Sequence, residues 1–228
     1  MNKLKEKVAK IESEINEISF KNKKPVVIDG IINIEKYFES DIKILWILKE
    51  AYSEESWSYI EKFRDYEWLK KYGRRIPTLK RVIYTTYGVT EQSTWTDIPY
   101  SNEEEAFPPL EKIALINIKK IPGSNSSNDN EINKAYKQNE KLLTKQIDLC
   151  NADIIFFGNT LQYCNKSIFK DLNKTQKQIS TFGNHFYDTG EKLYIDTWHP
   201  AVRGKGFTDK GYVMDLVEIV NKWKKTNA

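Results

Sequence analysis

The chain has 228 residues, of which 39% are hydrophobic and 30% are charged, and its formal net charge is +4. This length suits one domain with a substantial core, and the aromatic content of 13% excludes a disordered chain. No segment approaches the run of about 18 apolar residues that a membrane span needs. Cys150 and Cys164 are too few for a disulfide framework or a four-thiolate cluster.

The chain begins with a charged, amphipathic pattern that predicts a helix over residues 2–19. This segment lacks the apolar core of a signal peptide, so we expect a cytoplasmic protein. A turn-rich entry segment follows, and then four short apolar runs predict buried strands at 42–48, 112–118, 152–158 and 192–198. Helical patterns separate or follow these runs at 55–72, 76–88, 131–149, 160–172 and 210–224.

Strands that alternate with helices predict an α/β fold. We expect a doubly wound three-layer sandwich with a central four-stranded parallel sheet and an extra N-terminal helix. The whole chain, residues 1–228, is expected to form one domain, with the helix and entry segment at 1–41 and the core at 42–225.

Polar or conformationally special residues follow each of the four predicted strands. They are Glu50 after the first, Asn117 at the end of the second, Gly158-Asn159 after the third and His199-Pro200 after the fourth. Each has an ordinary structural interpretation: a helix N-terminal acid, a turn asparagine, a strand-to-helix cap and a core histidine. Right-handed crossovers place all four strand ends on one edge of a parallel sheet, where ligands bind. Their convergence therefore favours a functional site, and Pro200 restricts His199 to extended geometry.

The ordered segments "LKEAY", "INIKKIP", "FFGNT" and "WHPA" resemble the uracil-DNA glycosylase superfamily from about residue 42 to residue 225. That family has an acidic motif, an Asn strand, a glycine turn and a His-Pro motif in this order. The first motif here lacks the family's glycine and proline, and two registers fit. In one, Glu50 stands for the water-positioning aspartate and Tyr52 for the tyrosine; in the other, Glu50-Ala51 matches a Glu-Ala form. The missing cysteines exclude the iron–sulfur version.

The resemblance implies hydrolysis of the N-glycosidic bond of a uracil-like or modified base in DNA, single- or double-stranded, after base flipping. Catalysis is then expected from Glu50, near the cationic sugar and its water, and His199, a donor to the departing base. The base-binding residues are expected to be Tyr52, Asn117, Gly158 and Asn159, and the phosphate-binding residues Lys120, Ser124 and Arg203. No metal, cofactor or membrane partner is expected.

Two alternatives stay open at this stage. The altered first motif also fits a non-catalytic module that binds a nucleotide or modified DNA with the same fold. Arg74, Arg75 and Arg81 form either a solvated helix face or a phosphate-facing patch. Most of the aromatic residues between 49 and 111 are expected to lie in the core or cover it, and one or two of them could stack on a flat ligand.

Overall fold

The computed structural model describes residues 1–123, 126–165, 168–169 and 171–227. The α-helices are α1 (Asn2–Asn22), α2 (Ile34–Glu39), α3 (Tyr59–Lys62), α4 (Tyr66–Tyr72), α5 (Pro77–Thr90), α6 (Asp129–Cys150) and α7 (Asp209–Asn227). The strands are β1 (Val27–Ile28), β2 (Gly30–Ile31), β3 (Ile44–Leu48), β4 (Trp57–Ser58), β5 (Ile113–Asn117), β6 (Ile154–Gly158), β7 (Gln178–Ile179), β8 (His185–Asp188) and β9 (Leu193–Thr197). Short 3-10 turns are η1 (Trp95–Asp97), η2 (Glu104–Ala106), η3 (Pro108–Lys112), η4 (Leu161–Tyr163) and η6 (Leu172–Lys174).

The protein is a mixed α/β fold built on a seven-stranded, mostly parallel sheet with the order β2-β5-β3-β6-β9-β8-β7. The four apolar runs of the sequence form β3, β5, β6 and β9, which pair in parallel as neighbours. The sheet has three more strands than the four expected. β2 pairs antiparallel with β5 at one edge; at the other edge β8 pairs antiparallel with β9, and β7 pairs antiparallel with β8. These additions have two to four residues each and no continuous apolar run, so hydrophobicity gives them little signal.

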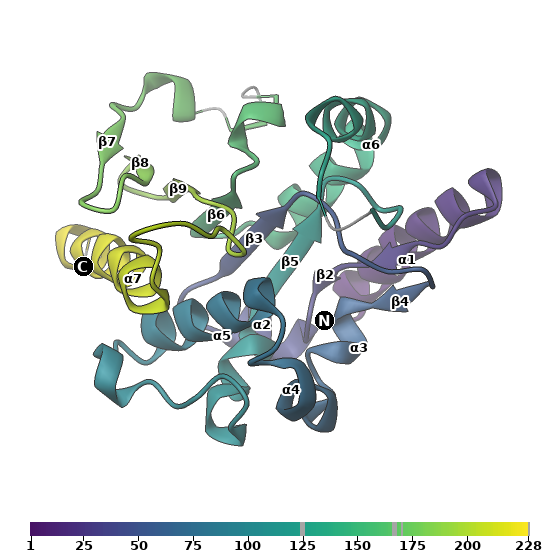
Figure 1. Ribbon diagram of the computed structural model, residues 1–228. Coiled ribbons are helices and arrows are strands. Elements are labelled where there is room, and N and C mark those ends of the chain that lie inside the picture. The colour runs from purple at the N-terminus through teal and green to yellow at the C-terminus, as the bar shows by residue number, and fades with distance from the viewer. Residues whose placement is uncertain (124–125, 166–167, 170, 228) are drawn as a thin grey trace.

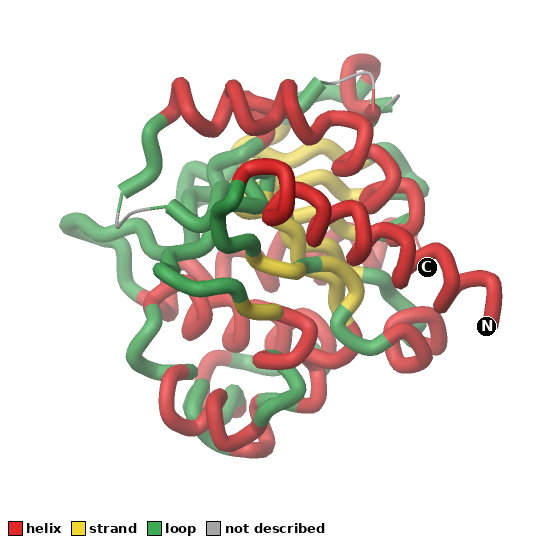
Figure 2. The backbone as a smooth tube through the Cα atoms, turned by 90° about the vertical axis from the view of Figure 1, so that its right-hand side faces the viewer, coloured by secondary structure: helices red, strands yellow, loops and turns green. Residues whose placement is uncertain are grey.

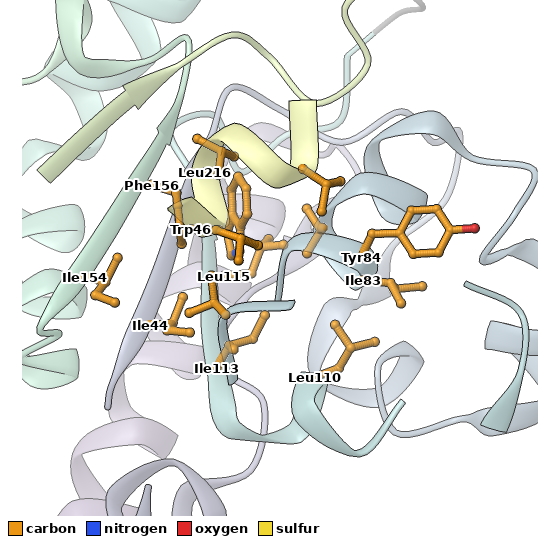
Figure 3. Packing of buried hydrophobic residues seen from close by; sticks show 14 of the residues in the cluster. Ile44, Trp46, Ile83, Tyr84, Leu110, Ile113, Leu115, Ile154, Phe156 and Leu216 are labelled. Carbon is orange, nitrogen blue, oxygen red and sulfur yellow. The ribbon is translucent and has the colours of Figure 1, made fainter. Parts of the chain in front are cut away.

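Helices cover both faces of the sheet (Figures 1 and 2). One face packs on α5 and α7, and the other on α2 and α6, while α1 lies on α6. Trp46 of β3 stacks on Phe156 of β6 with ring centroids 4.5 Å apart, at the centre of the first face (Figure 3). Every residue of β3, β5 and β6 is buried, as the continuous apolar runs predict for strands covered on both faces.

The expected helices at the chain's start, at 76–88, at 131–149 and at its end correspond to α1, α5, α6 and α7. The helix expected over 160–172 is wrong for the described part of that segment, which holds the short turns η4 and η6. Its spaced apolar residues Leu161, Cys164 and Leu172 are nevertheless buried in the core. Asn159, the residue before this segment, has a left-handed backbone conformation with φ 59°.

Within the described residues, no helix is both long and apolar enough to cross a membrane.

Candidate functional site

A pocket of about 440 Å³ lies beyond the carboxyl ends of the parallel strands. Glu50 after β3 and His199 after β9 both line it, together with Tyr52 and the strand residues Leu48 and Leu115. β3 lies between β5 and β6, so the chain leaves β3 toward one side of the sheet and leaves β6 toward the other. Ligands in α/β sheets bind at such a switch in strand order.

His199 is held in one ring orientation by its own turn. The Val202 N–H donates to the His199 carbonyl at 2.8 Å, which closes a turn with Pro200 in its second position. Inside this turn, the Ala201 N–H donates to Nδ1 of His199 at 3.1 Å. Burial, with the Lys49 ammonium nearby, lowers the pKa of His199 to about 4, so the ring is neutral at pH 7. Because Nδ1 accepts a bond, the proton lies on Nε2, which becomes the donor for a ligand.

Glu50 forms an ion pair with Lys119, which follows β5. Its side chain is 4% exposed, and Lys119 Nζ lies 2.7 Å from one carboxylate oxygen and 3.0 Å from Glu131. Burial alone would lower the pKa of Lys119, but the two carboxylates raise it above its ordinary value. Lys119 therefore remains a cation and fixes the carboxylate of Glu50 at the pocket.

Gly123 makes room for this carboxylate. Tyr52 and Gly123 form a parallel bridge, and a Cβ on Gly123 would lie only 1.9 Å from a Glu50 carboxylate oxygen. Any side chain at position 123 would therefore displace Glu50. The glycine that follows β5 thus determines where the carboxylate that follows β3 can lie.

Asn117 lies behind the pocket instead of on its lining. It is fully buried, and its backbone N–H donates to Asp29 Oδ2 at 2.8 Å. Its side-chain amide nitrogen lies 3.5 Å from the same Asp29 oxygen. Tyr59, by contrast, lines the pocket. Burial raises the pKa of Tyr59 and the charge of Asp29 raises it further, so this hydroxyl keeps its proton. Asn117 therefore lies off the described pocket lining, where the sequence predicted a base contact.

The prediction of a phosphate contact for Lys120 is contradicted by its burial. Its ammonium lies 2.6 Å from Asp29 Oδ1 and 2.7 Å from Gln146 Oε1, and the Lys120 and Asp29 side chains are both fully buried. Gln146 also donates to that aspartate oxygen at 2.9 Å. Burial lowers the pKa of Lys120, against the opposing effect of Asp29. Lys120 is therefore part of a buried structural ion pair.

Gly158 and Asn159 also lie off the described pocket lining. A Cβ on Gly158 would meet Leu48 Cδ2 at 2.6 Å and Pro200 Cδ at 3.1 Å, so this glycine lets the His199 turn approach β3. The Asn159 N–H is bound to the Thr197 carbonyl at 2.8 Å, and a 3-10 turn follows instead of an α-helix. That amide is not free to hold a base or phosphate in the way the sequence suggested.

The remaining predicted residues lie near the surface or outside the description. Tyr52 lines the pocket and is 62% exposed, which places it at the mouth. Arg203 is exposed two residues after Ala201, which also lines the pocket. Ser124 lies outside the described residues, but Ser127 from the same loop reaches the pocket.

The structure shows which aromatic residues of the long connection line the pocket. Trp57, Tyr59, Phe63 and Trp68 line the pocket, and Trp57 lies with its ring centroid 4.4 Å from Tyr59 and 6.4 Å from Trp68. β4 carries Trp57 and pairs in parallel with β1 of the entry segment. Hydrophobic spacing alone could not single out these residues, because their placement depends on that distant pairing.

A second cavity, of about 590 Å³, opens at the opposite edge of the sheet, near Ile44 at the start of β3. Half of its lining residues are charged, and none of them is a predicted site residue. Chemistry and topology therefore favour the smaller pocket at the carboxyl edge.

Among the described residues, no group of three or more His, Cys, Asp and Glu side chains is arranged to hold a metal ion. No protein-family model matches the chain. A search of curated proteins finds no match either. The functional interpretation therefore depends on the geometry of the pocket.

Proposed function

We propose that this protein hydrolyses the N-glycosidic bond of a uracil-like or modified base in DNA, as a divergent member of the uracil-DNA glycosylase superfamily. One observation carries the proposal: a neutral His199, with its donor on Nε2, and the carboxylate of Glu50 line the same aromatic-walled pocket. The finer fold assignment, a doubly wound three-layer sandwich, belongs to the same proposal. Its support is the parallel order β5-β3-β6-β9 with helices on both faces.

His199 serves the departing base. Cleavage leaves negative charge on a base oxygen, and a preorganised donor at that oxygen stabilises the transition state more than the ground state. A neutral imidazole suits this role because it donates a hydrogen bond without first having to be protonated. The Ala201 N–H keeps the proton on Nε2 throughout.

Glu50 serves the sugar. The transition state resembles an oxocarbenium ion, which a nearby carboxylate stabilises while it orients the attacking water. Lys119 holds that carboxylate in place but also shares its charge. The role therefore requires that the second carboxylate oxygen remain open to water in the pocket.

The aromatic residues serve recognition. A base flipped out of the DNA stack needs a replacement surface, and Trp57, Tyr59 and Trp68 supply large flat faces on one side of the pocket. The exposed Tyr52, Arg74, Arg75 and Arg203 are proposed to meet the nucleic acid around the mouth.

The second candidate is a non-catalytic module that binds a nucleotide or modified DNA. The Glu50–Lys119 ion pair favours it, because a carboxylate already neutralised by a lysine is a weaker electrostatic partner for a cationic sugar.

The decisive experiment uses oligonucleotides that each contain one uracil, hypoxanthine or other modified base. The parent protein should release one of these bases and leave an abasic site, which alkali converts to a shorter band. Glu50→Gln keeps the shape but removes the charge, so we expect release about 100-fold slower with binding retained.

Exposed Glu54→Gln is the matched control and should behave as the parent does. Binding of one base without release from any member of the panel would establish the module instead. A Glu50→Gln rate equal to that of the parent would remove Glu50 from the chemistry.

A further inference from the structure

Arg81, one of the three clustered arginines, does not face solvent. It lies on α5 with 6% of its surface exposed and packs over the ring of Tyr212 of α7, 5.0 Å from the ring centroid. The interpretation of this arginine as part of a phosphate-facing patch is therefore wrong, and its guanidinium has another set of partners.

Those partners lie in the loop that follows His199 and at Asp209, the first residue of α7. One terminal nitrogen donates to the Pro200 carbonyl at 3.1 Å and to the Val202 carbonyl at 2.9 Å. The other donates to the Phe207 carbonyl at 3.1 Å, and Nε donates to Asp209 Oδ1 at 2.9 Å. A planar guanidinium offers this fork of donors, which a lysine cannot reproduce.

One of these contacts bears directly on the histidine. The Pro200 carbonyl and the Ala201 N–H belong to the same planar peptide group. Arg81 binds the carbonyl side of that group, and Nδ1 of His199 accepts from its N–H side. Rotation of this one peptide would break both bonds, so the two are coupled.

Tyr212 holds the chain segment that precedes His199. Its hydroxyl donates to the Trp198 carbonyl at 2.9 Å and accepts from the Thr197 hydroxyl at 3.3 Å. The residues before and after His199 are thus held by a stacked Arg81–Tyr212 pair that lies outside the pocket lining.

We propose that Arg81 is a positioning residue that orients the Pro200–Ala201 peptide and thereby holds His199 in the tautomer with its proton on Nε2. As a contribution to catalysis the proposal rests on the proposed base release, but the tautomer itself is independent of that reaction. Arg81 acts only through His199 and touches no substrate.

The test compares Arg81→Lys with the parent by ¹⁵N NMR of the histidine rings. The two ring nitrogens have distinct shifts, so the tautomer is read directly. Lysine keeps the charge but cannot make most of the hydrogen bonds of the guanidinium. We therefore expect the bond from the Ala201 N–H to Nδ1 of His199 to weaken, and both tautomers of His199 to be populated. In the base-release assay, kcat should fall about 10-fold with KM within about twofold, because the donor is misplaced and not the binding surface.

Arg64→Lys is the matched control, since Arg64 is exposed on the same connection and contacts no part of the His199 loop in the described structure. Tyr212→Phe is the second variant: it keeps the ring under Arg81 and removes only the hydroxyl, with its bonds to Trp198 and Thr197. A smaller shift in the same direction supports the proposal even if Arg81→Lys fails to fold. An unchanged His199 tautomer in the folded variants would overturn it. A changed tautomer in a protein that releases no base would uphold the positioning role and reject the proposed function.

Discussion

Replacing His199 with alanine should lower the rate of base release by about 100-fold or more, because it removes a donor that acts on charge formed in the transition state. The pocket wall around it is supplied by Leu48, Ala51 and Tyr59, so the cavity should persist and binding should weaken far less than the rate falls. Single-turnover measurement with the best oligonucleotide substrate separates the two effects.

His185 provides the matched control, because it is the chain's other histidine and lies half-buried in β8, off the described pocket lining. His185→Ala should keep the parent rate to within about threefold. A His199→Ala protein that releases base as fast as the parent would show that another group serves the leaving base.

Asp29→Asn should reduce the free energy of unfolding by about 3–5 kcal/mol, because it leaves the Lys120 ammonium buried without its counter-charge. The free energy of unfolding of a folded protein is only about 5–15 kcal/mol, so urea denaturation at pH 7 should show a much lower midpoint for the variant. The lone Lys120 would have a pKa well below that of a solvated lysine. At pH values between the pKa of Lys120 in the folded variant and its pKa in the unfolded chain, only the unfolded chain keeps the lysine protonated. The free energy of unfolding of the variant should therefore increase as the pH rises toward about 10.

Glu14→Gln is the control for an ion pair at the surface, since Glu14 lies 2.7 Å from Lys145, which is about half exposed. Such pairs contribute about 0–1 kcal/mol, so this variant should be nearly as stable as the parent. Equal losses for Asp29→Asn and Glu14→Gln would contradict the structural role given to Asp29 and Lys120.

The sequence predicts the central strands well because each is a continuous apolar run covered on both faces. It also predicts that Glu50 and His199 share one edge, since parallel strands end together. The sequence does not predict the edge strands or the 3-10 turns η4 and η6, because local hydrophobicity does not distinguish a short edge strand from a turn, or a buried 3-10 turn from a buried α-helix.

The roles of the other predicted residues depend on contacts with distant parts of the chain. Lys120 looks like a phosphate ligand until Asp29, about 90 residues away, is seen beside it in the core. Asn117 likewise hydrogen-bonds Asp29 and lies behind the pocket, and Arg81 hydrogen-bonds residues between 200 and 209 instead of facing solvent. A single sequence offers no signal for such pairings, because Lys, Arg, Asp and Asn side chains are usually found at the solvated surface.

The account depends most directly on the state of the His199 ring, which ¹⁵N NMR measures in the unmodified protein. The account predicts a neutral ring with its proton on Nε2 at pH 7, a titration midpoint near pH 4 and a shift of the Nε2 resonance when a recognised free base is added. A midpoint near the ordinary value of about 6.5, with no response to any base of the panel, would contradict it.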